Sequence, residues 1–350
     1  MTPARVEALR QAVQHNCDIA DARHAADLPL CQFLLQMREL YRWRHGLDFA
    51  TVPPRAALGA WLAERELAWD ALEAEAFVPL PAGPASGAEL DPFDLEAIND
   101  HLAPHGWIYG AGHVDAGRPG FFLAELLRHE PGPPVVQHCG RELARGLFAP
   151  PAALQGGHTI VLRRDALARW LWMLWEGFAL QRPQGPFALL MARHGITDTA
   201  GFIAALPALT DMAARVLLRH EQGEAVAAGW LEPGWATLRQ ALTDRRASLQ
   251  LRAVRDLIAD ASVTLPALLD TDDVDGLHFW FATFEGLRTQ ACPDWQEAYV
   301  AWYAGDGGSA LRAACARAAQ RLVVQARALL AAGTDLAAVT AQLQAVFARR

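Results

Sequence analysis

The sequence predicts a predominantly helical α+β protein, with a small antiparallel sheet in the middle of the chain and an all-helical C-terminal half. Two patterns support this class. Apolar residues recur at helical spacing over most of the chain, whereas short apolar runs bounded by Gly and Pro occupy residues 105–165. Strands and helices do not alternate as a parallel, doubly wound sheet requires. We expect an N-terminal helical segment over 1–84, a sheet region over 85–165 and a helical domain over 166–350.

Three amphipathic helices are predicted in the N-terminal segment, over residues 4–16, 28–45 and 56–77. The third helix leads into PLPAGPASGAELDP, whose Pro, Gly and small residues form the clearest boundary in the chain. We therefore place a domain edge at residues 81–92.

The junction between the first two helices carries Cys17, Asp21 and His24, spaced i, i+4 and i+7. If it is helical, the three side chains share one face and could form a metal site or a thiolate–imidazole pair. The alternative is a buried cysteine, a capping or paired aspartate and a surface histidine. We expect mostly structural roles, because Asp18 and Asp21 make the surroundings too negative for a reactive thiolate.

The middle of the chain begins with a short helix over residues 92–102, introduced by Asp91 and Pro92. About four strands follow, over 107–109, 120–126, 134–138 and 158–162. The turn HEPGPP at 129–134 is expected to join two of these strands. The glycine loop at 110–112 lacks the third glycine of a dinucleotide-binding fingerprint, so it gives little support for nucleotide binding.

Helical periodicity continues from residue 165 to the C-terminus. Two helices are expected to flank Gly195, and Gly333 and Asp335 are expected to end one helix and cap the next. The other predicted helices cover 165–181, 209–228, 235–258, 276–290, 295–303, 309–332 and 335–347. The twelve tryptophans are expected mainly in the core.

Composition excludes several classes of function. The net charge is −8 and no basic stripe is present, so we expect neither nucleic acid nor a membrane surface as partner. All 31 basic residues are Arg, which removes Walker A, Schiff-base and Ser-Lys chemistry. The five cysteines form no C-x-x-C pair and the first residues lack a signal-peptide core. These features favour a cytoplasmic protein.

The chemically distinctive stretch is LTDMAARVLLRHEQGEAVAA, residues 209–228. An apolar stripe at helical spacing runs along it and continues into His220 and Glu224, which lie one turn apart, with Glu221 at the flank. The pattern is a variant of the H-E-x-x-H zinc helix in which the second histidine is replaced by Glu224. Charged groups on an apolar face require compensation.

The first hypothesis is a metal-dependent hydrolase with one divalent metal ion, zinc being the first expectation. His220 and Glu224 would be ligands and Glu221 the general base, as in H-E-x-x-H enzymes. Glu176 is taken as the third ligand, although Asp256 and Asp260 are equally open because no spacing specifies it. The substrate would be a small molecule or a peptide, and the oligomeric state stays open.

Two alternatives come from other classes of protein. The first is a non-catalytic helical interaction or scaffold protein, in which arginines such as Arg163, Arg164 or Arg255 satisfy the buried His and Glu residues. The second is a redox or transfer enzyme that depends on Cys17.

Several segments together resemble a known protein family. They are NCDIADARHA, LLQMRELYRW, DPFDLEAIND, YGAGHVDAGRPGFFLAEL, GRELARGLFAPPA and LLRHEQGE, and they span roughly residues 15–300. They are similar to an uncharacterised bacterial family known only as N- and C-terminal domains of unknown function. The resemblance implies a two-part architecture and no particular activity.

Overall fold

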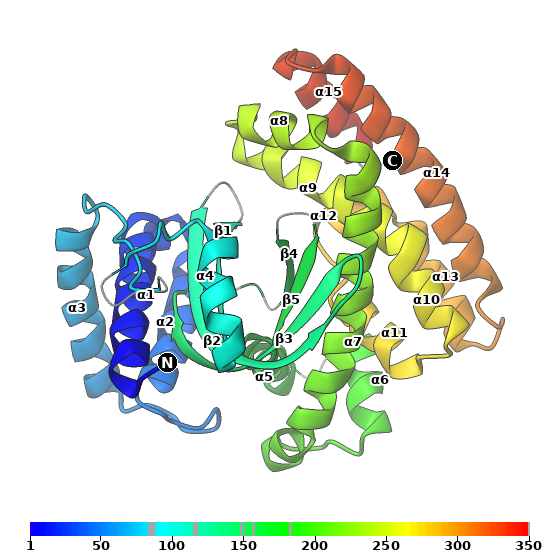
Figure 1. The fold of residues 1–350 in the computed structure, drawn as a ribbon. Coiled ribbons are helices and arrows are strands. Elements are labelled where there is room, and N and C mark those ends of the chain that lie inside the picture. The colour runs from blue at the N-terminus through cyan, green and yellow to red at the C-terminus, as the bar shows by residue number, and fades with distance from the viewer. Residues whose placement is uncertain are drawn as a thin grey trace. The chain divides into compact units, whose positions relative to one another are not determined.

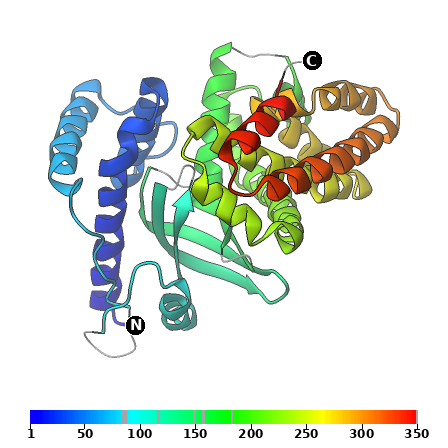
Figure 2. The same cartoon turned by 90° about the horizontal axis from the view of Figure 1, so that it is seen from above.

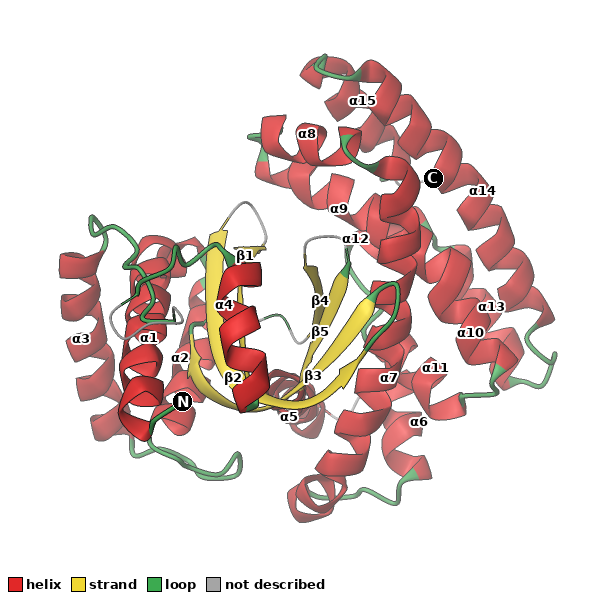
Figure 3. Ribbon diagram, viewed as in Figure 1, coloured by secondary structure: helices red, strands yellow, loops and turns green. Residues whose placement is uncertain are grey.

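The fold is taken from a computed structural model (Figure 1). It describes residues 1–82, 88–114, 118–147, 150, 152–155, 158–181 and 184–348. The strands of the described chain lie between residues 107 and 163, and helices precede and follow them (Figure 3). The predicted class, a predominantly helical α+β protein with a small central sheet, is therefore confirmed.

The N-terminal helices are α1 (Pro3–His24), α2 (Leu30–Arg44), α3 (Arg55–Leu72) and α4 (Leu95–Leu102). α1 starts where expected, because Thr2 caps it and accepts a hydrogen bond from the backbone N–H of Arg5. It runs well past the predicted end at residue 16, so the junction that carries Cys17 is helical. Nothing in that junction breaks a helix, since its first Pro is at position 29.

The strands are β1 (Trp107–Val114), β2 (Arg118–Glu130), β3 (Val135–Arg145), β4 (Ala152–Gln155) and β5 (Thr159–Arg163). They form one sheet in the order β1-β2-β3-β5-β4, in which the pairs β1/β2, β2/β3 and β4/β5 are antiparallel. The turn predicted at 129–134 does join β2 to β3. The expected glycine loop at 110–112 is instead part of β1, where Gly110 faces the Phe122 ring too closely for a Cβ.

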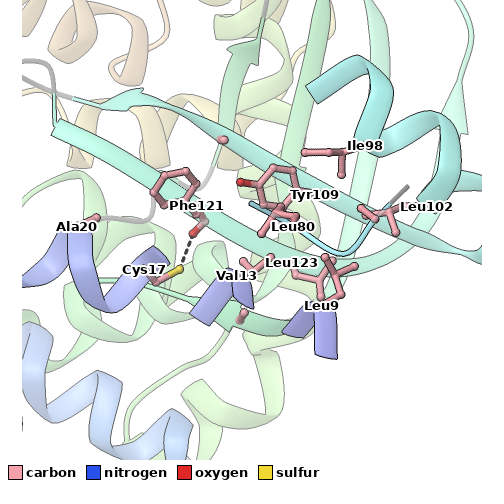
Figure 4. Packing of buried hydrophobic residues seen from close by; sticks show 13 residues of the cluster. Leu9, Val13, Cys17, Ala20, Leu80, Ile98, Leu102, Tyr109, Phe121 and Leu123 are labelled. Atoms are coloured by element: carbon pink, nitrogen blue, oxygen red, sulfur yellow. Dashed lines mark hydrogen bonds between the residues drawn. The ribbon is translucent and has the colours of Figure 1, made fainter. Parts of the chain in front are cut away.

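A hydrophobic core joins α1 to β1 and β2 (Figure 4). Leu9, Val13 and Cys17 lie along one face of α1, at intervals of four residues, and contact Tyr109 and Leu123 from the strands. All five side chains are almost fully buried. α1 is therefore fixed to the sheet by its apolar stripe.

The chain after the sheet is entirely helical in its described parts. Its elements are α5 (Arg164–Gln181), α6 (Pro186–Arg193), α7 (Thr199–Leu231), α8 (Gly234–Ala241), α9 (Arg245–Ala259), the π-helical turn η4 (Asp260–Thr264), α10 (Leu265–Asp270), α11 (Val274–Ala282), α12 (Leu287–Ala291), α13 (Asp294–Tyr303), α14 (Ser309–Ala332) and α15 (Leu336–Val346). As predicted, Gly333 ends α14 and Asp335 caps α15, which packs against α14 (Figure 2).

Two predicted helices are each divided in the structure. The helix expected over 235–258 is α8 and α9, separated where Asp244 caps α9 by accepting from the N–H of Ala247. The helix expected over 276–290 is α11 and α12, and Gly286 between them has φ 63°, which a glycine adopts without strain. Periodicity alone did not reveal these short interruptions.

α7 is the longest described helix, with 33 residues, and it passes Pro207 without a break. Its length and apolar composition alone would let it cross a membrane. In this fold it is instead a core helix that packs against α9, η4 and α11, and Phe202, Leu209, Ala213 and Val216 are buried on it. These contacts place α7 within the packed helices of unit 2, whose residues are given below.

The chain divides into two compact units. Unit 1 covers 1–130, 136–151 and 163–172, and unit 2 covers 131–135, 152–162 and 173–350. This division by spatial contact does not test the expected boundaries at residues 84 and 165, which stay a prediction.

Candidate metal centre

The candidate site lies in unit 2, between α7 and α9. The two helices approach closely at Gly223, where an added Cβ would lie 2.8 Å from the carbonyl oxygen of Ala259. Any larger residue would push the helices apart. Gly223 therefore lets the polar residues on either side of it reach α9.

Two pairs of residues connect the helices around this contact. His220 and Glu224 are one turn apart on α7, and Asp256 and Asp260 are one turn apart along α9 and the start of η4. His220 Nδ1 lies 2.8 Å from Asp260 Oδ1, and His220 Nε2 lies 3.7 Å from Glu224 Oε1. One ligand atom from each of His220, Glu224 and Asp256 lies within 4.8 Å of the others.

Arginines of α9 border the same carboxylates. Arg255 Nη2 donates to Glu224 Oε2 at 2.6 Å, and both side chains are mostly buried. Arg252 is more exposed and its Nε lies 3.8 Å from Asp256 Oδ2. Arg255, one of the arginines predicted as possible partners, therefore forms an ion pair with Glu224 of α7. Arg163, another of them, pairs instead with Glu142 in unit 1.

Asp260 has contacts from three directions. Its side chain is fully buried, and Oδ1 accepts from Trp280 Nε1 at 3.1 Å as well as from His220. Its other oxygen lies 3.9 Å from Arg288 Nη1 and has no hydrogen-bond partner among the described residues. A buried carboxylate with these contacts is held in one orientation.

Charge and burial separate the pKa values of these groups. Burial alone would raise the pKa of Glu224, but the His220 hydrogen bond and the charge of Arg255 outweigh it and lower the pKa to about 2. Burial and the Glu224 charge raise the pKa of Asp256 to about 7. Burial would lower the pKa of His220, yet the Asp260 carboxylate holds it well above its usual range. In the metal-free chain, the carboxylates around His220 therefore favour its protonated form, whereas burial favours the neutral form of Asp256.

Glu221 belongs to the same electrostatic cluster. Its side chain is buried on α7, and burial raises its pKa to about 7, with the charges of Glu224 and Asp256 adding to the effect. A carboxyl group that titrates near neutrality suits a general base, because it can both take up and release a proton at physiological pH.

The sequence-predicted residues are distributed as follows. His220, Glu221 and Glu224 lie together in the cluster, with Asp256 and Asp260 from the set considered for the third ligand. Glu176 lies on α5, outside the one group of potential ligands found among the described residues. The signal that could have favoured Asp256 is its i, i+4 spacing from Asp260, along α9 and the start of η4, which matches the i, i+4 pair on α7. No sequence signal pointed to Trp280.

Cys17, Asp21 and His24 share a helix without forming a cluster of ligands. The Cys17 thiol donates to the backbone carbonyl of Phe121 at 3.3 Å (Figure 4), and burial, together with the charge of Asp21, raises its pKa well above the usual range. Asp21 accepts from the backbone N–H of Leu147 at 3.0 Å, while His24 lies near Asp27. A neutral, buried thiol is a poor nucleophile, so the geometry gives no support to chemistry at Cys17.

Two family models match the chain. The model described as "Family of unknown function (DUF6866) N-terminal domain" matches residues 8–163, and the corresponding C-terminal domain matches residues 168–350. No curated protein and no solved structure matches the chain. The matches confirm the family resemblance found in the sequence and carry no description of an activity.

Proposed function

The chain belongs to the DUF6866 family of unknown function, and from the geometry of its site we propose that it is a metal-dependent hydrolase. His220, Glu224 and Asp256 would bind one divalent cation, and Glu221 would be the general base. The observation that carries the proposal is the convergence of three ligand atoms within 4.8 Å, from two helices that a glycine brings together.

The donor set suits a first-row divalent metal. One imidazole nitrogen and two carboxylate oxygens are ligands found for zinc, manganese and iron, and we keep zinc as the first expectation. Ligands about 2.1 Å from a tetrahedral ion lie about 3.4 Å from one another. His220 Nε2 and Glu224 Oε1, 3.7 Å apart, are already close to that separation. Glu176 is replaced by Asp256 in this proposal.

In the proposed hydrolysis, the metal ligands and Glu221 have different roles. A divalent cation held by these residues would supply Lewis acidity and would make a water beside it more acidic. Glu221, with its pKa near 7, takes the proton from the attacking water and returns one to the leaving group. This chemistry fits an amide or ester bond in a small molecule or a peptide. We further propose a cytoplasmic location. All five cysteines are free thiols, as is usual in a reducing compartment.

A second function is favoured by one specific observation, the 2.6 Å ion pair between Arg255 and Glu224. It satisfies Glu224 without a metal, as expected of a non-catalytic helical interaction protein. In that case the cluster only stabilises the contact between α7 and α9.

Metal stoichiometry separates these two proposals. We would strip the purified full chain with a chelator, add zinc, manganese or iron(II), and measure bound metal by elemental analysis. The metal proposal expects one ion per chain, lost in His220→Ala and Glu224→Ala and retained in Asp211→Ala, an exposed control on the same helix. Glu221→Gln should keep the ion and lose hydrolysis of p-nitrophenyl acetate, because an amide cannot accept the proton. No bound ion in the wild type would refute the metal proposal.

A further inference from the structure

We propose that Asp260 is the positioning residue of this site, which fixes the His220 ring so that Nε2 faces Glu224. The effect of Asp260 on metal binding rests on the proposed function. The contact by which Asp260 orients His220 does not depend on it. His220 Nδ1 and Asp260 Oδ1 are 2.8 Å apart, and Asp260 is fully buried. The contact joins two helices across 40 residues of sequence.

A carboxylate acceptor at Nδ1 keeps the proton of a neutral histidine on that nitrogen. The lone pair then lies on Nε2, which is the ring nitrogen near Glu224. Histidines that bind metals nearly always donate their second ring N–H in this way, and loss of the acceptor weakens metal binding by about 10- to 100-fold. Asp260 therefore determines which nitrogen His220 offers to a cation.

The fold holds Asp260 in place by two devices. The first is the second donor on the same oxygen, Trp280 Nε1 at 3.1 Å. The second is the π-helical turn that begins at Asp260, in which the N–H of Leu265 bonds to the Asp260 carbonyl five residues earlier. Pro266 has no N–H and would clash with the carbonyl of residue 262 in a regular α-helix, which explains the wider turn. Such π turns occur frequently at functional sites.

Asp260 has a different role from Asp256. Oδ1 of Asp260 already accepts two hydrogen bonds, and Oδ2 faces the Arg288 guanidinium at 3.9 Å. It is not part of the group of three whose ligand atoms lie within 4.8 Å. Its chemistry is that of an acceptor behind the histidine, and Asp256 is the carboxylate left for a cation.

The test compares Asp260→Asn with Thr264→Val, a matched control in the same π turn whose buried hydroxyl has no hydrogen-bond partner among the described residues. Titration calorimetry with zinc and with manganese measures the Kd of each chain after circular dichroism has confirmed its fold. Asp260→Asn should weaken metal binding about 10- to 100-fold, because an asparagine amide can stabilise the wrong tautomer. Thr264→Val should bind like the wild type, and equal affinity in Asp260→Asn would overturn the inference.

A second measurement needs no metal and leaves Asp260 unchanged. In the ¹⁵N-labelled wild-type protein, the His220 Nδ1–H should give a downfield ring signal protected from exchange, assigned by its loss in His220→Gln. Absence of a protected signal overturns the inference. If the signal is present but the wild type binds no metal, the proposed function fails and the positioning of His220 by Asp260 stands. If the wild type binds metal and Asp260→Asn binds it equally well, only the positioning role fails.

Discussion

Replacement of Gly223 by alanine tests the helix contact on which the candidate site depends. The new Cβ would lie 2.8 Å from Ala259 O and 2.9 Å from Ala259 Cβ. Non-bonded carbon atoms reach their best separation at about 3.5–4.0 Å, so α7 and α9 must move apart by roughly 0.6–1 Å at this point. The obstacle is mainly backbone of the facing helix, which cannot rotate away.

The expected magnitude follows from two opposing effects. Overpacking of this kind costs about 1–3 kcal/mol, whereas alanine in place of glycine inside a helix gains about 1 kcal/mol. Gly229, on the same helix, has no atom within 4 Å of its would-be Cβ, so Gly229→Ala shows the helix gain alone. The unfolding free energies of the two variants should therefore differ by about 1–3 kcal/mol, with Gly223→Ala the less stable.

Urea denaturation of the metal-free chain, followed by circular dichroism, measures this difference. The same displacement separates His220 from Asp260 and Glu224 from Asp256, so Gly223→Ala should also bind zinc more weakly than Gly229→Ala. Equal stability of the two alanine variants would refute the close contact between α7 and α9.

Other perturbations test the electrostatics of both units. Glu224→Ala leaves the mostly buried Arg255 without its carboxylate and should lower the free energy of unfolding in urea by about 3–5 kcal/mol, and an unchanged value would contradict the ion pair. The pKa values of Asp256 and Glu221, raised to about 7, make the folded state prefer their neutral forms, so the metal-free chain should lose stability as pH rises from about 4 through 7. Each group contributes up to about 3–4 kcal/mol, and a flat profile from pH 5 to 8 by urea titration would contradict this. Cys17→Ser should fold and keep any hydrolase activity, and loss of activity with an unchanged circular dichroism spectrum would argue for a role of the thiol.

Much of the fold was predictable because it depends on local patterns. Helical periodicity, and the change of period between residues 105 and 165, predicted the fold class and the order of elements. Capping residues gave some boundaries, as at Gly333 and Asp335. The divided helices around Asp244 and Gly286 were missed, because three or four interrupting residues barely change the periodicity of a long window.

The sequence by itself determined that His220, Glu221 and Glu224 lie together, since residues one turn apart share a helix face whatever surrounds them. It could not choose among Glu176, Asp256 and Asp260, because the partner of a helix face is set by how distant segments pack. Only the tertiary structure decided this, by placing α9 against α7 at Gly223 and directing Asp256 and Asp260 to Glu224 and His220. The physical reason is that the deciding contact is steric. Because Gly223 has no Cβ, α7 can approach α9 closely, and the spacing of residues within either helix does not predict which helix will pack there.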